Sequence, residues 1–326
     1  CGLSGLEDAP AFRYHLAAGD SLLHGSEQLQ FDFGVELTED AVAANFAYAT
    51  ENLQALRSIL RNGQYDAVVG NPPYIEVKDA KLRALYRRLY ASCKGGYVLS
   101  VPFMEKFFSL AKSGEASGFI GQITSNSFAQ REFGKALIEK FFPTVDLISV
   151  INSEGAWIPG HNMDGTPTVI LIGRNRAPSG STLRTVLSKG IRESGREPNG
   201  SGPYWRSLVE HLNDEEFENE WVAIRDSPRS DLARHPWNLV GGGIRQLIDG
   251  LGEGRPVLGN RAARIGFYGD SHADELFFLP PHFAQRGGLP AEVLRLASRG
   301  SSVRDWAGLK AEVALLPYDS SKRLLP

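Results

Sequence analysis

The stretch that decides the fold is YDAVVG at residues 65–70, which runs directly into NPPY at residues 71–74. The first six residues form a short apolar run between turn signals, since Asn62 and Gly63 precede it and two prolines follow it. Such a run is typical of a buried parallel strand. Because open α/β sheets bind ligands beyond the carboxyl ends of their strands, the tetrapeptide is expected to lie at a ligand site.

The tetrapeptide combines rigidity with hydrogen-bond acceptors. Pro72 and Pro73 have fixed φ angles and no N–H groups, so their carbonyl groups are free to accept. Asn71 adds an amide oxygen, and Tyr74 adds a flat ring with a polar tip. This set suits a planar substrate bearing an NH2 group. Asn71 Oδ1 and the Pro72 carbonyl would hold both amino hydrogens and point the nitrogen lone pair at an electrophile, by positioning and fixed dipoles.

The alternative interpretation of NPPY is a plain turn. A given tetrapeptide occurs by chance in on the order of one in several hundred chains of this length. Its place after an apolar strand lowers that chance further, so the sequence favours a functional role.

The rest of the first half alternates strand-like and helix-like segments. Strands are predicted at residues 12–18, 118–124, 145–151 and 168–173, and helices at residues 39–61, 79–90, 101–111 and 131–142. This alternation favours an α/β sheet with helices on both faces. A Gly/Pro-rich link, rather than a helix, joins the last two strands, which predicts an antiparallel pair at that end of the sheet.

The second half has a different character. Residues 177–202 are rich in Ser, Gly, Arg and Pro and predict a linker or a surface loop. Residues 203–326 predict an α+β region, with strand-like pieces at 221–224 and 263–268 and a helix at 243–251. Its scattered arginines are more typical of a solvated surface than of a phosphate track.

Composition excludes several classes of protein. The chain has 326 residues, 35 basic and 38 acidic, so a strongly cationic binder such as a histone is excluded, although a local basic cleft is not. Its two cysteines, Cys1 and Cys93, offer no disulfide framework and predict a reducing, cytoplasmic setting. The histidines show no metal-ligand spacing, and no apolar run is long enough to predict a membrane partner.

Residues 65–74 resemble motif IV of the S-adenosylmethionine-dependent adenine-N6 DNA methyltransferases. The closer resemblance is to the large PglX-type enzymes of BREX and phage-growth-limitation antiphage systems, and to related fused restriction–modification enzymes. Three further segments are similar to these families: AGDSLL at 18–23, ITSNSF at 123–128 with FGK at 133–135, and AWIPGH at 156–161 leading into TPTVILIGR at 166–174.

The resemblance implies roles for individual residues. Asn71, Pro72, Pro73 and Tyr74 would be catalytic, and Tyr74 would stack on the target base, together with Trp157. Asp20, in the segment similar to motif III, and Asn71 would contact the cofactor, S-adenosyl-L-methionine. Base flipping gives the aromatic residues a physical purpose, because stacking offsets part of the unstacking cost. A plain core tryptophan remains an equal reading of Trp157, and a strand-end cap is the alternative for Asp20.

The resemblance also implies a Rossmann-like methyltransferase sheet with an antiparallel last strand. Residues 1–176 would form a partial catalytic domain, residues 177–202 a linker or surface loop, and residues 203–326 an α+β linking or DNA-contacting region. The family's Gly-rich first motif lies before motif III, yet only residues 1–19 precede Asp20. The cofactor motif is therefore incomplete here, and the natural protein is expected to continue upstream.

The expected function is a site-specific DNA adenine-N6 methyltransferase of a bacterial antiphage or restriction–modification system. Double-stranded DNA and other subunits of a defence system are the expected partners. Glutamine-N5 protein methyltransferases and some RNA guanine methyltransferases share the tetrapeptide, but their chains usually end soon after the catalytic sheet. A non-catalytic DNA-binding or assembly module, lacking a complete cofactor site, is the other alternative.

Overall fold

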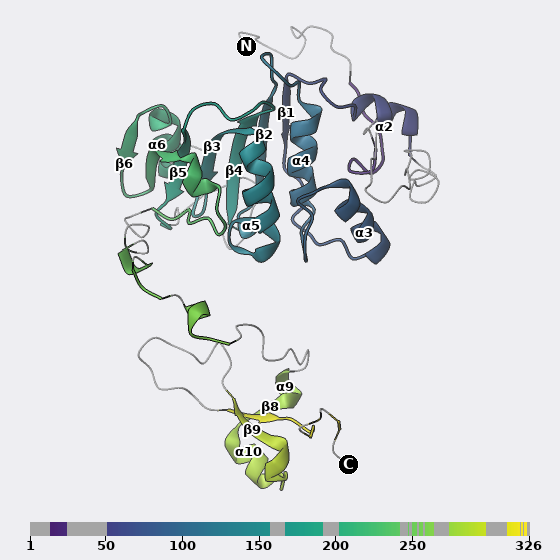
Figure 1. Cartoon of the computed structure of the whole chain (residues 1–326), viewed down its shortest axis with the longest axis vertical. Coiled ribbons are helices and arrows are strands. Elements are labelled where there is room, and N and C mark those ends of the chain that lie inside the picture. The colour runs from purple at the N-terminus through teal and green to yellow at the C-terminus, as the bar shows by residue number, and fades with distance from the viewer. Residues whose placement is uncertain are drawn as a thin grey trace. The chain divides into compact units, whose positions relative to one another are not determined.

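The chain is seen in a computed structural model that divides into two units, residues 1–253 and residues 254–326 (Figure 1). The described residues are 14–24, 51–156, 167–191, 202–241, 247, 250–252, 254–256, 258–263, 274–297, 312–319, 321, 323 and 324.

A seven-stranded sheet forms the centre of the first unit, in the order β1-β2-β4-β3-β5-β7-β6. The strands are β1 (Ala67–Gly70), β2 (Phe119–Ser125), β3 (Asp146–Asn152), β4 (Thr168–Arg174), β5 (Thr182–Ser188), β6 (Glu216–Glu218) and β7 (Val222–Pro228). The sheet is mixed. β1 is parallel to β2, and β3 is parallel to β5, whereas β4 runs antiparallel to both β2 and β3. The α/β class and the predicted antiparallel pair are therefore confirmed.

The sheet extends further than the sequence predicted. β4 does not close it, because β5, β7 and β6 continue beyond β3. β5 lies inside residues 177–202, so the prediction of a linker or surface loop is wrong for Thr182–Ser188. The strand pairs with β3 on one side and β7 on the other, and these two ladders supply the backbone partners that a surface loop lacks.

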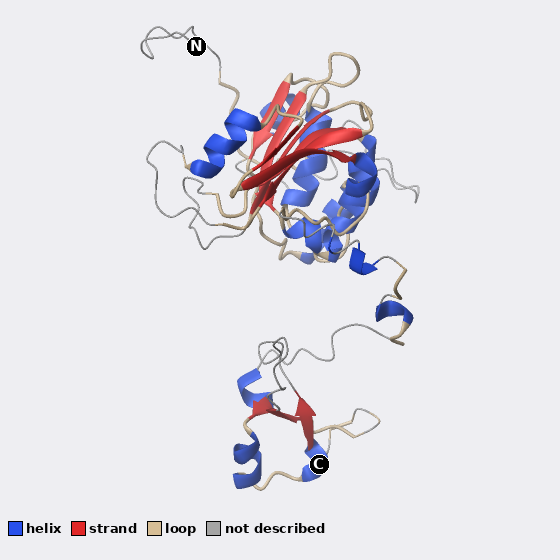
Figure 2. Ribbon diagram, turned by 90° about the vertical axis from the view of Figure 1, so that its left-hand side faces the viewer, coloured by secondary structure: helices blue, strands red, loops and turns tan. Residues whose placement is uncertain are grey.

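Helices cover the sheet on both faces (Figure 2). They are α2 (Leu53–Ile59), α3 (Ala80–Leu89), α4 (Ser100–Leu110), α5 (Ser127–Gln130), α6 (Pro203–His211) and α7 (Arg229–Leu232). Successive strand residues enter different cores, as the pleat requires. Val150 of β3 packs in the core that includes α4, and the next residue, Ile151, packs in the core that includes Tyr204 of α6.

The helix predicted over residues 131–142 is broken into short pieces. They are the 3-10 helix η2 (Glu132–Gly134), the π-helix η3 (Leu137–Phe141) and the 3-10 helix η4 (Phe142–Thr144). At Gly134 the chain passes so close to α5 that an added Cβ would lie 1.8 Å from the Phe128 carbonyl oxygen. This approach requires glycine, and it sets the direction of the chain after α5.

Strand β1 corrects the expectation of a buried strand. It is parallel to β2, as predicted, but its residues alternate between exposed and half-buried, and Val69 is 78% exposed. The reason is its position, because β1 lies at the end of the strand order and pairs with β2 alone among the described residues. Residues 14–18 also differ from expectation, since they form no strand.

The second unit holds a separate three-stranded antiparallel sheet, in the order β8-β10-β9. Its elements are η5 (Leu258–Asn260), α9 (Asp274–Phe277), β8 (Phe278–Leu279), α10 (Pro281–Arg286), η6 (Ala291–Val293), β9 (Leu294–Ala297) and β10 (Glu312–Leu315). The α+β description suits this unit, whereas residues 203–228 add α6, β6 and β7 to the first. No helix among the described residues is long and apolar enough to cross a membrane.

Candidate active site

The NPPY tetrapeptide lies where the sequence placed it, at the carboxyl end of β1. Because β1 and β2 are parallel, with Gly70 opposite Gln122, their carboxyl ends meet at one edge of the sheet. Gly70 has no side chain for a reason, since an added Cβ would lie 2.7 Å from Cζ of Phe107 on α4. The α4 ring therefore supports the backbone from which the tetrapeptide begins.

The four residues differ in their exposure. Asn71 and Pro73 are exposed, Pro72 is buried, and Tyr74 is half-buried. The amide of Asn71 is thus open to an incoming group rather than turned into the core. Pro72, which lies between the exposed residues Asn71 and Pro73, is buried and holds the bend against the protein.

A hydrogen bond inside the tetrapeptide was not foreseen from the sequence. The Tyr74 hydroxyl donates to Asn71 Oδ1 at 2.5 Å. Burial raises the pKa of Tyr74 to about 12, so the hydroxyl keeps its proton near neutral pH and stays a donor. A carbonyl oxygen accepts two hydrogen bonds, which leaves one lone pair of Asn71 Oδ1 for a substrate. The tyrosine therefore also orients the amide.

Asp20 caps a turn rather than a strand. Its Oδ1 accepts from the Leu22 amide at 2.8 Å, its Oδ2 accepts from the Tyr86 hydroxyl, and its own amide donates to Glu51 Oε1 at 3.0 Å. The strand-end cap that was the alternative for Asp20 is therefore not seen, because residues 14–18 form no strand and the contact caps a turn. Each carboxylate oxygen retains acceptor capacity, so the donor set fits an amino group of a bound cofactor, and that contact stays a prediction.

Helix α3 connects this turn to the tetrapeptide. It begins after Asp79, whose carboxylate accepts from the amides of Lys81 and Leu82. Tyr86, on its buried side, donates to Asp20, and Tyr90, the residue directly after the helix, donates to the Leu22 carbonyl at 2.8 Å. Burial, followed by the Asp20 charge, raises the pKa of both phenols, so they remain donors.

Three buried polar side chains hold the same turn from the other side. His24 Nε2 lies 3.4 Å from Glu51 Oε2, with both side chains almost fully buried. Lys106 of α4 donates to the carbonyls of His24 and Leu60 at 2.8 and 3.3 Å. Sequence reasoning missed these residues, and their separation along the chain left no motif that could have identified them.

Trp157, the remaining residue of the predicted site, lies outside the described residues, so its stacking role stays a prediction. Within the described part of the chain no group of three His, Cys, Asp or Glu residues could hold a metal ion.

Comparison with known proteins gives one family match and two related sequences. Residues 20–156 match the family described as Eco57I restriction-modification methylase. The chain is 40% identical over 337 residues to "Adenine-specific methyltransferase PglX" of Streptomyces coelicolor, covering 99% of this chain and 27% of that protein. It is 23% identical over 230 residues to "Type II methyltransferase M.PaeR7I" of Pseudomonas aeruginosa, covering 66% of this chain and 35% of that protein.

Among solved structures, the type IIG restriction endonuclease BpuSI matches with 16% identity and a TM-score of 0.41, over 79% of this chain and 32% of that one. The chain thus spans between a quarter and two fifths of the length of the curated relatives it matches. The resemblance to the PglX-type adenine-specific methyltransferases is confirmed, and residues 20–156 carry the Eco57I restriction-modification methylase match.

Proposed function

We propose that this chain supplies the methyl-acceptor half of a site-specific DNA adenine-N6 methyltransferase of a bacterial antiphage or restriction–modification system. The observation that carries the proposal is the exposed Asn71 side chain at the carboxyl end of β1, which is followed by the buried Pro72 and accepts a hydrogen bond from the half-buried Tyr74. The name of the PglX relative, an adenine-specific methyltransferase, supports the choice of adenine. Because the relatives are much longer than this chain, the activity is proposed for the whole protein.

In the proposed reaction the tetrapeptide holds the target amino group of a flipped-out adenine. Asn71 Oδ1, through its remaining lone pair, and the Pro72 carbonyl accept the two amino hydrogens. This contact favours a pyramidal nitrogen whose lone pair faces the methyl donor. The Tyr74 ring stacks on the base, while its hydroxyl keeps the Asn71 amide in orientation. Pro73 keeps the bend rigid.

S-Adenosyl-L-methionine, when bound, supplies the electrophilic methyl group. Asp20 is proposed to accept a hydrogen bond from the cofactor, since its oxygens retain lone pairs beside the contacts to Leu22 and Tyr86. Asn71 would lie against the same cofactor from the acceptor side. Trp157 is proposed as a second stacking ring.

Double-stranded DNA is the proposed substrate, with other subunits of a defence system as further partners. The restriction-modification description of the matched family supports DNA as the substrate. The free, buried thiol of Cys93 suits a reducing compartment such as the cytoplasm.

The test is Asn71→Ala in the full-length protein. Transfer of tritiated methyl groups to DNA should fall at least a hundredfold, since a preorganised acceptor is lost, while cofactor affinity measured by calorimetry should stay within a few-fold. Asn62→Ala is the matched control, because Asn62 is also exposed but precedes β1. Retained transfer in Asn71→Ala would reject the mechanism.

The same calorimetry distinguishes the proposed methyltransferase from the non-catalytic alternative. A full-length protein that binds DNA but no S-adenosyl-L-methionine would be an assembly module with this fold. Transfer to a glutamine side chain of a protein, or to RNA, in place of DNA would support the other enzyme classes that share the tetrapeptide.

A further inference from the structure

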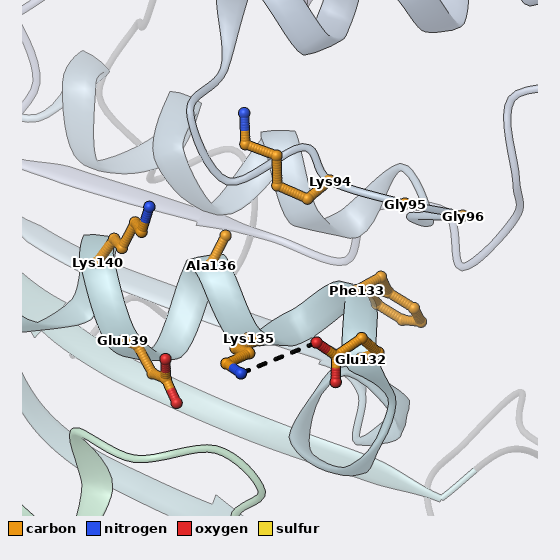
Figure 3. Close-up of a pocket in the computed structure, with 9 residues that line it drawn as sticks. All are labelled: Lys94, Gly95, Gly96, Glu132, Phe133, Lys135, Ala136, Glu139 and Lys140. Carbon is orange, nitrogen blue, oxygen red and sulfur yellow. Dashed lines mark ion pairs between the residues drawn. The ribbon is translucent and has the colours of Figure 1, made fainter. Parts of the chain in front are cut away.

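A second feature of the catalytic edge lies beside the tetrapeptide. A cleft of about 490 Å³ opens between the loop that joins α3 to α4 and the helical segment that follows α5 (Figure 3). Its lining residues are Lys94, Gly95, Gly96, Glu132, Phe133, Lys135, Ala136, Glu139 and Lys140. The volume is within the range of ligand pockets.

Both walls of the cleft are tied to strand ends at the catalytic edge. The first wall continues into Val98 and Leu99. Val98 forms an antiparallel bridge with Glu76, and the Leu99 amide donates to the Ile75 carbonyl at 2.9 Å, so this wall is fastened to the two residues after Tyr74. The second wall follows β2 through α5. Because β1 and β2 are parallel, the Glu132 end of this wall begins on the side of the sheet that carries NPPY, and the segment then runs back toward the start of β3.

The charged side chains that line the cleft point in different directions. In Figure 3, Ala136 and Lys140 point toward the loop that carries Lys94, whereas Glu139 and the Lys135–Glu132 pair point the other way. The Lys94 side chain extends from the loop away from this helix. Lys135 lies 4.0 Å from Glu132, and Glu139 accepts from the His235 amide at 3.2 Å. Lys94 and Lys140 form no ion pair with any described residue. The helix side that faces the loop therefore carries the charge of Lys140, and Lys94 adds a second positive charge at the rim of the cleft.

The loop itself is fixed and open. Arg87 donates to the Gly95 carbonyl at 2.6 Å and lies over the Tyr97 ring. Gly95 has a φ of +59°, and a Cβ added at Gly95 or Gly96 would meet nothing within 4 Å. The amides of Gly95 and Gly96 donate to no described residue. Successive unpaired amides around a left-handed residue are a known type of anion-binding concavity.

From this combination we propose that the cleft between residues 94–96 and 132–140 binds a backbone phosphate of the DNA strand next to the target nucleotide. Lys140, with Lys94 at the rim, neutralises the phosphate, the glycine amides are its hydrogen-bond donors, and Ala136 lies between the two walls. The site rests on the proposed function, since it assumes a DNA substrate. Its role is to hold the strand in position while the base occupies the tetrapeptide.

The experiment compares three variants of the full-length protein for binding to a random-sequence DNA duplex over a range of salt concentrations. For the double variant Lys94→Ala/Lys140→Ala, affinity should fall about tenfold and the slope of log K against log salt should decrease by about 0.9, as for one lost phosphate contact. Gly96→Asp should weaken binding at least as much, because its side chain has room but carries the wrong charge. Lys112→Ala, at the amino end of β1 and paired with Asp66 at 2.6 Å, should leave the slope unchanged.

At subsaturating DNA, methyl transfer by the lysine variants should fall in parallel with their affinity, since a phosphate contact positions the strand, whereas Lys112→Ala should transfer methyl groups at the wild-type rate. Wild-type affinity and salt slope in both cleft variants, with wild-type protein still methylating DNA, would overturn the phosphate site alone. A wild-type protein that binds no DNA would overturn the proposed function and this site together. Loss of binding to free adenosine monophosphate, with DNA affinity intact, would identify the cleft as a mononucleotide site and contradict the proposal.

Discussion

Strands β1 and β3 belong to one sheet but differ in their surroundings. Six of the seven residues of β3 are buried, and it has β4 on one side and β5 on the other. None of the four residues of β1 is buried, and Val69 is 78% exposed. The tetrapeptide with the proposed chemistry follows the exposed strand. The stability of the sheet is thus concentrated away from the residues assigned to catalysis, and the two properties should respond separately to mutation.

The largest expected effect on stability is at the start of β3. The Asp146 carboxylate is almost fully buried and pairs with Arg229 at 2.6 Å and Arg176 at 2.8 Å. Asp146→Ala should lower the free energy of unfolding by about 3 kcal/mol, because it leaves two arginines without their buried partner. Urea denaturation measures the change. A loss below 1 kcal/mol would show that β3 is not the stabilising centre.

Asp146 also predicts a pH dependence. Burial alone would raise its pKa, but hydrogen bonds from Arg176 and the Ser179 amide, with the Arg229 charge, outweigh burial and hold the pKa below its usual range. The ion pairs therefore stabilise the fold fully above the unfolded pKa of about 3.9 and are lost as the pH falls through the lower folded value. The gap in stability between wild type and Asp146→Asn should be constant from pH 7 to 5 and narrow below about pH 4. A constant gap down to pH 2 would contradict this assignment.

A matched pair of valines tests the comparison directly. Val150 in β3 is fully buried, whereas Val69 in β1 is mostly exposed. Val150→Ala should cost about 2 kcal/mol, from two lost methylene equivalents and a cavity. Val69→Ala should cost less than about 0.5 kcal/mol, as at other exposed positions. Equal costs, measured by denaturation of both variants in the same buffer, would mean that β1 is as well covered as β3.

The expected effect at Tyr74 is on activity rather than on stability. Tyr74→Phe keeps the stacking ring but removes the hydrogen bond to Asn71 Oδ1, so kcat should fall about fivefold, the equivalent of roughly 1 kcal/mol. The kcat of Tyr74→Ala should fall further, since this variant also loses the stacking ring. Because the pKa of Tyr74 is raised to about 12, wild-type activity should show no loss from this hydroxyl up to pH 10. Phe and Ala variants of equal activity would rule out stacking.

The sequence predicted the regular elements well where apolar patterns are clean. The strands predicted at 118–124, 145–151 and 168–173 lie within about one residue of β2, β3 and β4. β5 was missed because the alternation of TLRTVLS is short and is flanked by Ser, Gly and Pro, which dominate the local composition. Strand order was also beyond local patterns, so the sequence could not show that β1 ends the sheet.

For the site, the position of the tetrapeptide could be predicted from the sequence, but its internal contacts could not. The bond from Tyr74 to Asn71 depends on backbone angles that no spacing encodes. The contacts of Asp20 to Tyr86 and Glu51 join residues far apart in the chain, so they follow from tertiary packing alone. The cleft at Lys94 and Lys140 was likewise invisible, because its charges come from two separate segments.

Helix α3 has a consequence for protein engineering. Its amino end follows the tetrapeptide by five residues, and its tyrosines hold the turn that begins at Asp20. A chimaera that exchanges the tetrapeptide loop with that of another enzyme would keep native phenol contacts only if residues 14–24 and 79–98 were transplanted as one block. Exchanging either segment alone should yield a protein that still folds around β3. In that protein the turn at Asp20 and the tetrapeptide would no longer keep their native relative positions.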